Sequence, residues 1–259
     1  MTTIASKNEA VTLVNISKRF PVNNEEHTQS ERIRDGYFYA LNDISFTLES
    51  GSCTLIAGAN GSGKSLLMSI IAGLEAPSSG TVKTAATVGL VFQEPDAQIL
   101  GETPAEDAAF GARNLGLSKD EVKMRVKDAL GDTGLADRAD FPARSLSGGE
   151  KRRLAVAGVL AMGVEIIIFD EPYANMDYPG VVQVNRLVKK LHADGKTVII
   201  LTHELEKCTA LADRVIVLCE GKKVFDGDAS GALSRDLEAW GIHHPLRNPA
   251  QKLEDLLWQ

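Results

Sequence analysis

Residues 58–65 have the types and spacing that bind phosphate. Their sequence, GANGSGKS, lies between a short apolar stretch at 54–57 and a helical pattern at 66–73 that ends at Gly73. Glycines let consecutive backbone N–H groups converge on phosphate oxygens, and the positive end of the following helix favours the anion. Lys64 can then reach the β- and γ-phosphates of a nucleotide, and the Ser65 hydroxyl can bind Mg²⁺. A plain glycine-rich turn is the alternative, which the strand–loop–helix order argues against.

Two adjacent acids, Asp170 and Glu171, end another apolar stretch at 166–169. Neighbouring side chains on a strand point in opposite directions, so the two carboxylates can take different roles. Asp170 suits an indirect contact to Mg²⁺, and Glu171 suits polarising the water that attacks a phosphate. Two acids after a strand are more often a solvated turn when they stand alone. Behind a phosphate-binding loop we favour the chemical interpretation.

The segment Leu146-Ser147-Gly148-Gly149-Glu150 has the spacing of a capping box that opens a helix, with Ser147 and Glu150 as the reciprocal pair. A cap alone does not require two glycines, which expose backbone N–H groups at a positive helix end. Such an end is an anion site. Because the chain already has one phosphate-binding loop, a second suggests contact with the nucleotide of another subunit.

Composition limits the classes of protein to which the chain can belong. It has 259 residues, of which 44% are hydrophobic and 24% charged, as expected for a globular protein with one large domain or a core with an inserted lobe. No apolar run approaches the roughly 20 residues of a membrane helix, and no signal peptide is evident, so we expect a cytoplasmic protein without a membrane span. The net charge of −7 argues weakly against nucleic-acid binding. Three cysteines without a close-spaced pair, Cys53, Cys208 and Cys219, are expected to be small buried side chains.

The chemical segments fall on alternating strands and helices, which predicts an α/β fold with a mostly parallel sheet. A polar stretch at about 21–35 reads as a surface loop, and residues 94–160 read as a helical lobe with capping patterns at Thr103 and Ser118. A helical stripe precedes the strand at 197–201. The expected strands are 11–16, 44–48, 54–57, 88–92, 166–169, 197–201 and 215–218.

In this order and spacing, the segments resemble the motifs of the ABC ATPases over nearly the whole chain. Residues 58–65 resemble the Walker A motif, and 146–150, followed by Lys151-Arg152-Arg153, resemble the LSGGQ signature with Glu in its last place. Residues 170–172 resemble the end of Walker B, and 174–177 resemble the D-loop. Gln93 after a strand matches the glutamine of the Q-loop, and His203 matches the switch histidine.

The resemblance implies a P-loop NTPase core with an inserted α-helical subdomain and an N-terminal antiparallel β subdomain. The whole chain, 1–259, is then one ABC ATPase domain, with its core at 1–93 and 161–230, the helical subdomain at 94–160 and a C-terminal tail at 231–259. It implies an ATPase that binds ATP and Mg²⁺ and works as a homodimer or with a paralogue, at the cytoplasmic face of a membrane beside transmembrane subunits. The signature of one copy completes the site of the other.

The residues that the resemblance assigns fall into three groups. The catalytic residues are Lys64, Gln93, Glu171 and His203. The nucleotide contacts are Phe20, Gly58, Asn60, Gly61, Ser62, Gly63, Lys64, Ser65, Leu66, Ser147, Gly148, Gly149, Glu150 and Asp177. The Mg²⁺ contacts are Ser65, Gln93 and Asp170.

The chain departs from the family pattern at two places. Leu66 stands where the family usually has a second hydroxyl residue, so one phosphate contact is in doubt. The aromatic residue that stacks on adenine is expected near the first strand. Phe20 follows Ser17-Lys18-Arg19 as in the family, whereas the loop after it leaves Tyr37 and Tyr39 as alternatives; a partly buried strand-end aromatic is the structural alternative for Phe20.

A narrower resemblance points to the ATPases of energy-coupling factor (ECF) transporters, which include cobalt and nickel importer ATPases. It rests on VFQEPDAQ at 91–98, DAAFG at 107–111 and WGIHHPL at 240–246. Importers of this type take up vitamins or transition-metal ions. An ATPase of a conventional importer with a periplasmic binding protein, and a non-transport ABC scaffold, remain as alternatives.

Two docking surfaces follow as expectations. Residues 96–100 and the helical lobe would meet a transmembrane partner, with Ile99 and Leu100 as apolar contacts, and the alternative is a turn with these residues folded inward. The C-terminal tail, with Leu253, Leu256 and Leu257 at helical spacing beside Trp258, would join the two ATPases or pack on its own subunit.

Overall fold

A six-stranded sheet forms the centre of the molecule. The structure is a computed structural model that describes residues 8–22 and 32–246. Five parallel strands follow the order β9-β4-β8-β7-β6, and β10 pairs antiparallel with β9 at one edge. The three central strands are buried along their whole length, which explains their continuous apolar sequences. The strands are β4 (Cys53–Ala57), β6 (Val88–Val91), β7 (Ile166–Asp170), β8 (Thr197–Thr202), β9 (Arg214–Cys219) and β10 (Lys222–Gly227).

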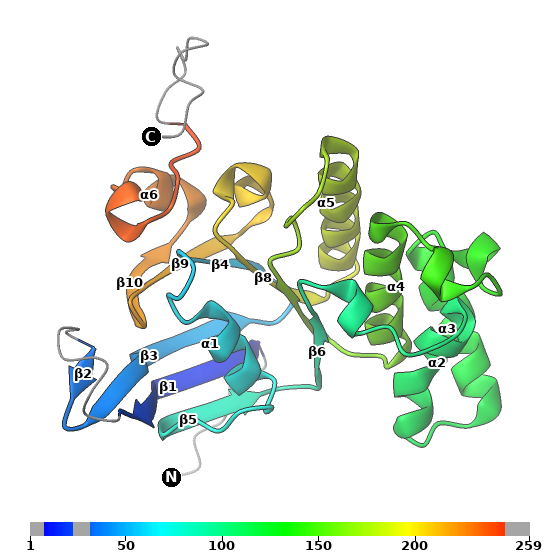
Figure 1. Cartoon of the computed structure of the whole chain (residues 1–259), viewed down its shortest axis with the longest axis horizontal. Helices are drawn as coiled ribbons and strands as arrows, with labels where there is room; N and C mark the ends of the chain where they lie inside the picture. Colours follow the sequence, from blue (N-terminus) through cyan, green and yellow to red (C-terminus); the bar gives the residue numbers. More distant parts are fainter. Residues whose placement is uncertain (1–7, 23–31, 247–259) are drawn as a thin grey trace.

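A second, antiparallel sheet lies beside the first, and helix α1 (Lys64–Ile71) fills the space between them (Figure 1). Its strand order is β2-β3-β1-β5. Leu67 and Met68 of α1 belong to one apolar core together with residues of β1 and β3 on one side and of β4 and β8 on the other. The strands are β1 (Glu9–Pro21), β2 (Ile33–Arg34), β3 (Tyr37–Glu49) and β5 (Ser79–Thr84).

The opposite face of the central sheet packs against α5 (Tyr178–Ala193), α6 (Ala229–Leu233) and one side of α4 (Gly148–Ala161). The same core continues past α6, because Leu237 and Ile242 are fully buried in it. Gly241 also lies against the loop after β4, where an added Cβ would come within 3.1 Å of the Ala59 side chain. Residues 231–242 therefore pack with the core, and the leucines and tryptophan of the expected tail lie outside the described residues.

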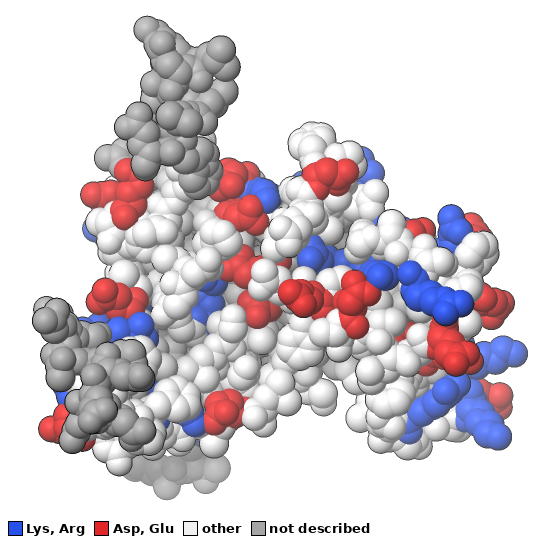
Figure 2. Space-filling view, viewed as in Figure 1, with Lys and Arg blue, Asp and Glu red and all other residues white. Residues whose placement is uncertain are grey.

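Three helices make a lobe at one side of the molecule, α2 (Pro104–Asn114), α3 (Lys119–Asp132) and α4, with an apolar core of their own (Figure 1). Their starts follow the local sequence. Ser118 and Ser147 each form a reciprocal capping box with the Glu three residues later. Thr103 caps α2 by accepting from the Glu106 N–H, although the Glu106 carboxylate turns to the N–H of Glu102 instead. Figure 2 shows acidic and basic side chains of the described residues interspersed over this lobe.

The α/β fold expected from the sequence is confirmed, as are its strands. Part of the stretch expected as a loop at 21–35 is instead ordered strand, because β1 runs to Pro21 and β2 pairs with β3. None of the helices in the described part is long and apolar enough to cross a membrane. Short 3₁₀ turns join the elements at Pro95–Ala97, Ala136–Arg138, Ala143–Ser145, Leu205–Lys207, Thr209–Leu211 and Glu238–Trp240.

Candidate active site

The loop between β4 and α1 forms an anion cradle. Gly58 is required by close packing, since a Cβ there would lie 2.4 Å from the Ser62 hydroxyl and 2.6 Å from a backbone oxygen of β9. Gly63 has φ +105° and precedes α1 without a side-chain cap, so the first N–H groups of the helix are left to a ligand. The Ser62 hydroxyl is buried without a hydrogen-bond partner. These unpaired donors suit phosphate oxygens.

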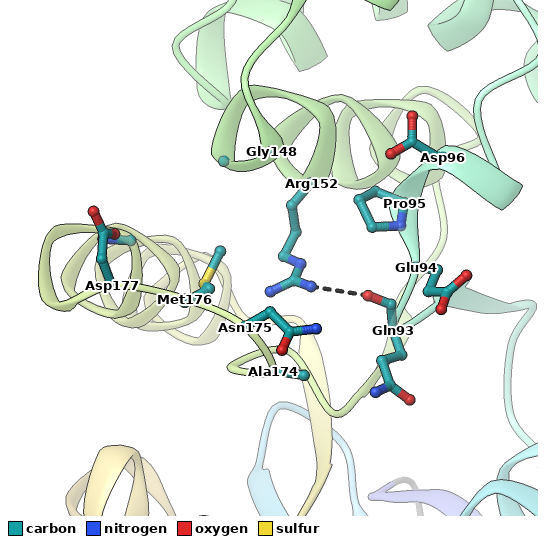
Figure 3. A pocket seen from close by; sticks show the side chains of 12 residues that line it. Gln93, Glu94, Pro95, Asp96, Gly148, Arg152, Ala174, Asn175, Met176 and Asp177 are labelled. Carbon is teal, nitrogen blue, oxygen red and sulfur yellow. Dashed lines mark hydrogen bonds between the residues drawn. The ribbon is translucent and has the colours of Figure 1, made fainter.

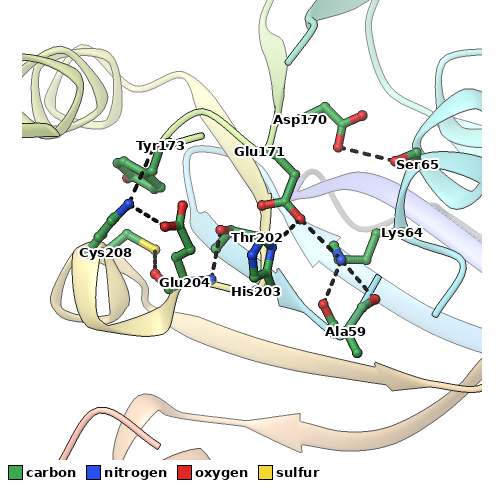
Figure 4. Close-up of polar contacts among 12 residues, drawn as sticks. Ala59, Lys64, Ser65, Asp170, Glu171, Tyr173, Thr202, His203, Glu204 and Cys208 are labelled. Atoms are coloured by element: carbon green, nitrogen blue, oxygen red, sulfur yellow. Dashed lines mark hydrogen bonds and ion pairs between the residues drawn. The ribbon is translucent and has the colours of Figure 1, made fainter. Parts of the chain in front are cut away.

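Glu171 joins the cradle to the next strand. One carboxylate oxygen, Oε1, lies 3.2 Å from Lys64 Nζ and 3.0 Å from His203 Nδ1 (Figure 4). Glu171 has φ +43°, an unusual backbone conformation for a non-glycine residue that turns the chain immediately after β7. Its second oxygen, Oε2, is buried without a partner. Lys64 also donates to the backbone oxygens of Gly58 and Ala59, at 2.6 and 3.2 Å.

Asp170 and Ser65 face each other on the other side of Lys64, and Ser65 Oγ lies 3.4 Å from Asp170 Oδ1. Burial raises the pKa of Asp170; the Ser65 hydrogen bond and Lys64 oppose this shift, while the Glu171 charge adds to it. A divalent cation here would favour the charged carboxylate. No cluster of three or more His, Cys, Asp or Glu is placed to hold a metal among the described residues, so a cation would need oxygen atoms from a ligand as well.

The aromatic residues near the first strand lie at the end of β1 and β3. Phe20 is exposed and pairs with Phe38 across the two strands, so the two rings share a face of the sheet. Arg32 stacks on the Phe38 ring at 4.6 Å and donates to the backbone oxygen of Gly61 in the cradle at 3.3 Å. Tyr37 and Tyr39 belong to the opposite face of the sheet. The Arg19 guanidinium stacks on the ring of Tyr37, and that of Arg34 on the ring of Tyr39.

A second cleft, of about 530 Å³, is lined by none of the cradle residues (Figure 3). Gln93 follows β6 on one side, and Gly148 and Gly149 open α4 on another. The third side is residues 174–177, where Asp177 caps α5 by accepting from the Gly180 N–H at 3.0 Å. The cradle residues, by contrast, come from the loop between β4 and α1, the start of α1, and the ends of β7 and β8. The structure therefore divides the predicted site residues between two clusters.

A family model described as "ABC transporter" matches residues 41–174, a stretch that contains the loop between β4 and α1, both acids, and the Gln93 and Gly148 sides of the second cleft. The chain belongs to the ABC transporter family. It is 40% identical to "Energy-coupling factor transporter ATP-binding protein EcfA" from Carboxydothermus hydrogenoformans, over 80% of this chain and 82% of that protein. It is 39% identical to "Cobalt import ATP-binding protein CbiO" from Rhodobacter capsulatus, over 80% of each.

Solved structures agree with this membership. CbiO1 from Clostridium perfringens, described as part of the ABC transporter complex CbiONQ, superimposes with a TM-score of 0.76 at 31% identity, over 90% of this chain and 93% of that one. A dimeric ATP-binding cassette bound to ADP and Pi has a TM-score of 0.71 at 26% identity, over 85% of this chain and 98% of that one. The resemblance expected from the sequence is confirmed, and the chain is an ATP-binding ATPase of the ABC family.

Two features of this ABC ATPase escaped the sequence reasoning. Arg152 is buried beside Gln93, although the sequence shows it only as one of three consecutive basic residues. Tyr173, two residues after Glu171, is fully buried and donates from its hydroxyl to Asn185 Oδ1 at 2.8 Å. Asn185 in turn donates to the backbone oxygen of Lys207 at 2.7 Å. The sequence does contain a signal for the burial of Arg152. The helix that begins at Gly148 has apolar residues on several sides, so one of the three consecutive basic residues 151–153 has to face the interior.

Replacing Lys64 with Ala is expected to weaken ATP binding by at least about tenfold, because loss of a hydrogen bond from a charged group costs about 1.5–3 kcal/mol. Calorimetry of the purified protein with ATP measures the change. Lys196→Ala is the matched control, since that lysine lies outside the cradle and pairs with Glu165 at 2.9 Å near the surface. Unchanged affinity in the Lys64 variant would contradict a phosphate contact.

Proposed function

We propose that the chain is the ATP-hydrolysing subunit of an importer of the energy-coupling factor type. The observation that carries the proposal is the cradle, in which one oxygen of Glu171 contacts both Lys64 and His203. A phosphate that takes over Lys64 releases this carboxylate beside the histidine, in position to orient an attacking water. Lys64 would then donate to oxygens of the β- and γ-phosphates, and His203 would contact the γ-phosphate.

Mg²⁺ fits the oxygen atoms on the other side of Lys64. The Ser65 hydroxyl would bind the ion directly, and Asp170 would hold it through its contact with Ser65 or through water. Gln93, which lines the second cleft in this structure, would complete the set once the loop after β6 brings its side chain to the cradle. The ion supplies charge neutralisation at the phosphates, while the residues of this chain position it.

Phe20 would carry the adenine ring. It shares a face with Phe38, and Arg32 connects that face to Gly61 in the cradle. Tyr37 and Tyr39 belong to the opposite face and serve this role less well. The backbone of residues 58–66 would bind the phosphates, with Leu66 contributing its N–H while its side chain packs on the core.

A second ATPase subunit would supply the remaining contacts. Ser147, Gly148, Gly149 and Glu150 begin α4 at the second cleft, apart from the cradle of the same chain. Asp177 lies in that cleft too. In a head-to-tail pair the signature of one copy would cover the nucleotide of the other, and hydrolysis would release the pair. The pair would act at the cytoplasmic face of a membrane, through transmembrane subunits.

The import of a vitamin or a transition-metal ion is proposed from the relatives, because the similar proteins include an ATP-binding protein of an energy-coupling factor transporter and a cobalt import ATP-binding protein. The 91–98 segment supports the same type. A conventional importer with a binding protein is the second candidate. Identification of the membrane proteins that co-purify with the chain separates the two, since an extracellular binding protein is needed only by the second.

A groove on the helical lobe suits the transmembrane partner. It is lined by Gln98, Leu100, Phe110 and Met162, with Leu100 67% and Phe110 49% exposed. Ile99, which the sequence placed in this contact, instead packs on the core of the lobe. Leu100 and Phe110 are therefore the apolar contacts to test.

The double variant Leu100→Asp with Phe110→Asp is expected to lose co-purification with membrane partners and to keep ATP binding, because two charges would enter an apolar interface. Pull-down from detergent-solubilised membranes measures the first property, and calorimetry the second. Met124→Asp is the control, since Met124 is 57% exposed on the same lobe but outside the groove. Normal assembly of the double variant would refute this docking site.

A further inference from the structure

Arg152 connects three segments of the nucleotide machinery. It lies in α4, four residues after Gly148, so it faces the same side of the helix as the start of the signature and lines the same cleft. One terminal nitrogen donates to the backbone oxygen of Gln93 at 2.8 Å (Figure 3). The other donates to the backbone oxygen of Pro172. Gln93 follows β6 and Pro172 directly follows Glu171, at the end of the neighbouring strand β7.

The surroundings of Arg152 are unfavourable for a cation. The residue is only 7% exposed, its Nε is buried without a partner, and burial lowers the pKa of its guanidinium. In the described part of the chain its two hydrogen-bond partners are backbone carbonyls, not carboxylates. A buried charge without an opposite charge costs several kcal/mol. An apolar side chain of similar length would fill the space without that cost. The advantage of arginine here is therefore that its two donors bind the backbone oxygens of Gln93 and Pro172.

The planar guanidinium explains why arginine suits this position. Two donors in a fixed fork set the distance between two acceptors, which the single ammonium of lysine does less rigidly. The neighbouring contact, between Lys151 and Asp96, does not fix the two loops in this way. Lys151 pairs with Asp96 at 2.6 Å, but Asp96 is 72% exposed, and exposed ion pairs contribute little.

We propose that Arg152 is a positioning residue, which fixes the loops of Gln93 and Glu171 relative to the signature helix so that the catalytic carboxylate and the glutamine are aligned when a second copy closes on the nucleotide. The inference rests on the proposed roles of Gln93 and Glu171. Arg152 lines the second cleft and is not one of the cradle residues. Its loss changes the rate of hydrolysis and leaves the phosphate cradle intact.

The test compares Arg152→Met, which removes the donors at similar length, with Arg152→Lys, which keeps a single cationic donor. For Arg152→Met we expect kcat to fall by about 10- to 100-fold, since misplacement of a catalytic group by about 1 Å can cost 10²-fold. The Kd for ATP stays within about threefold and the melting temperature within a few degrees. Arg152→Lys recovers part of kcat.

Arg125→Met is the matched control. Arg125 also donates from a guanidinium to a backbone oxygen, that of Met162 at 3.2 Å, but at the far end of α4. Its kcat is expected to stay near that of the wild type.

Three results would overturn the proposal. One is an unchanged kcat in Arg152→Met, and another is a parallel loss of kcat, ATP affinity and melting temperature, which describes a bracing role only. The third applies if Arg152→Met does not fold, in which case Arg152→Lys is the test. A wild-type kcat in Arg152→Lys would then show that the two-donor guanidinium is not needed. Glu171→Gln is assayed in parallel: if it hydrolyses ATP normally, the proposed function fails first, whereas an inactive Glu171→Gln with active Arg152 variants rejects only this inference.

Discussion

The Glu171→Gln variant is expected to bind ATP and nearly to stop hydrolysing it, with a fall in rate of about 10²- to 10⁴-fold, the range for loss of a general base. The amide has the shape of the carboxylate but cannot accept a proton from water. It also loses the ion pair to Lys64, so the lysine is free for phosphate and ATP affinity is kept or improved. Because closure depends on uncleaved ATP, the variant should accumulate as a pair of ATP-bound subunits.

Phosphate release and light scattering with ATP and Mg²⁺ measure the two effects. Glu165→Gln is the control, because Glu165 precedes the same strand, β7, and pairs with Lys196 near the surface, outside the cradle. Wild-type turnover in Glu171→Gln would reject Glu171 as the base. Loss of ATP binding in Glu171→Gln would instead show that Glu171 is needed to keep the cradle in a shape that binds phosphate.

A mixed pair of two inactive variants should regain hydrolysis. In a head-to-tail dimer of Ser147→Arg with Glu171→Gln, one composite site carries both changes and the other carries neither. Single-turnover cleavage should then reach about half of the bound ATP, since one of two symmetric sites is intact. If Ser147 acted within its own chain, each site would carry one change and the mixture would stay inactive.

Differently tagged copies allow the mixed dimers to be isolated before the assay. Two tagged copies of Glu171→Gln provide the control for residual activity. An inactive mixture, with mixed dimers demonstrated, would contradict the contact of Ser147 with the nucleotide of a partner. It would leave the capping box of α4 unaffected, because that box is formed within the chain.

Local sequence was sufficient for the parts that local physics decides. The spacing of glycines before a helix predicted the cradle. Two of the three expected capping boxes, those at Ser118 and Ser147, are complete. The third is incomplete because a neighbouring N–H, that of Glu102, competes for Glu106. Positions that depend on packing between distant segments were less predictable.

Three examples show that limit. Ile99 and Leu100 are adjacent and equally apolar, yet only Leu100 is exposed, since the 3₁₀ turn before them fixes which side faces the lobe. Arg152 is buried because two loops far apart in the sequence offer it carbonyl oxygens. Ile242 is buried in the main core, although the sequence placed it in a C-terminal tail at 231–259. A truncation after Leu246 therefore spares this core and tests whether the residues beyond it join two ATPase subunits.

The contact between Lys64 and Glu171 has a consequence for which anions can enter the cradle. The lysine already has an internal counter-ion, held close by the fold at a high effective concentration. A free phosphate ion brings few contacts and competes poorly with a tethered carboxylate. A nucleotide brings several phosphates and a base together, so under the proposed function we expect it to displace the carboxylate far more readily than a single phosphate ion does. The internal ion pair would then select against small anions by competition.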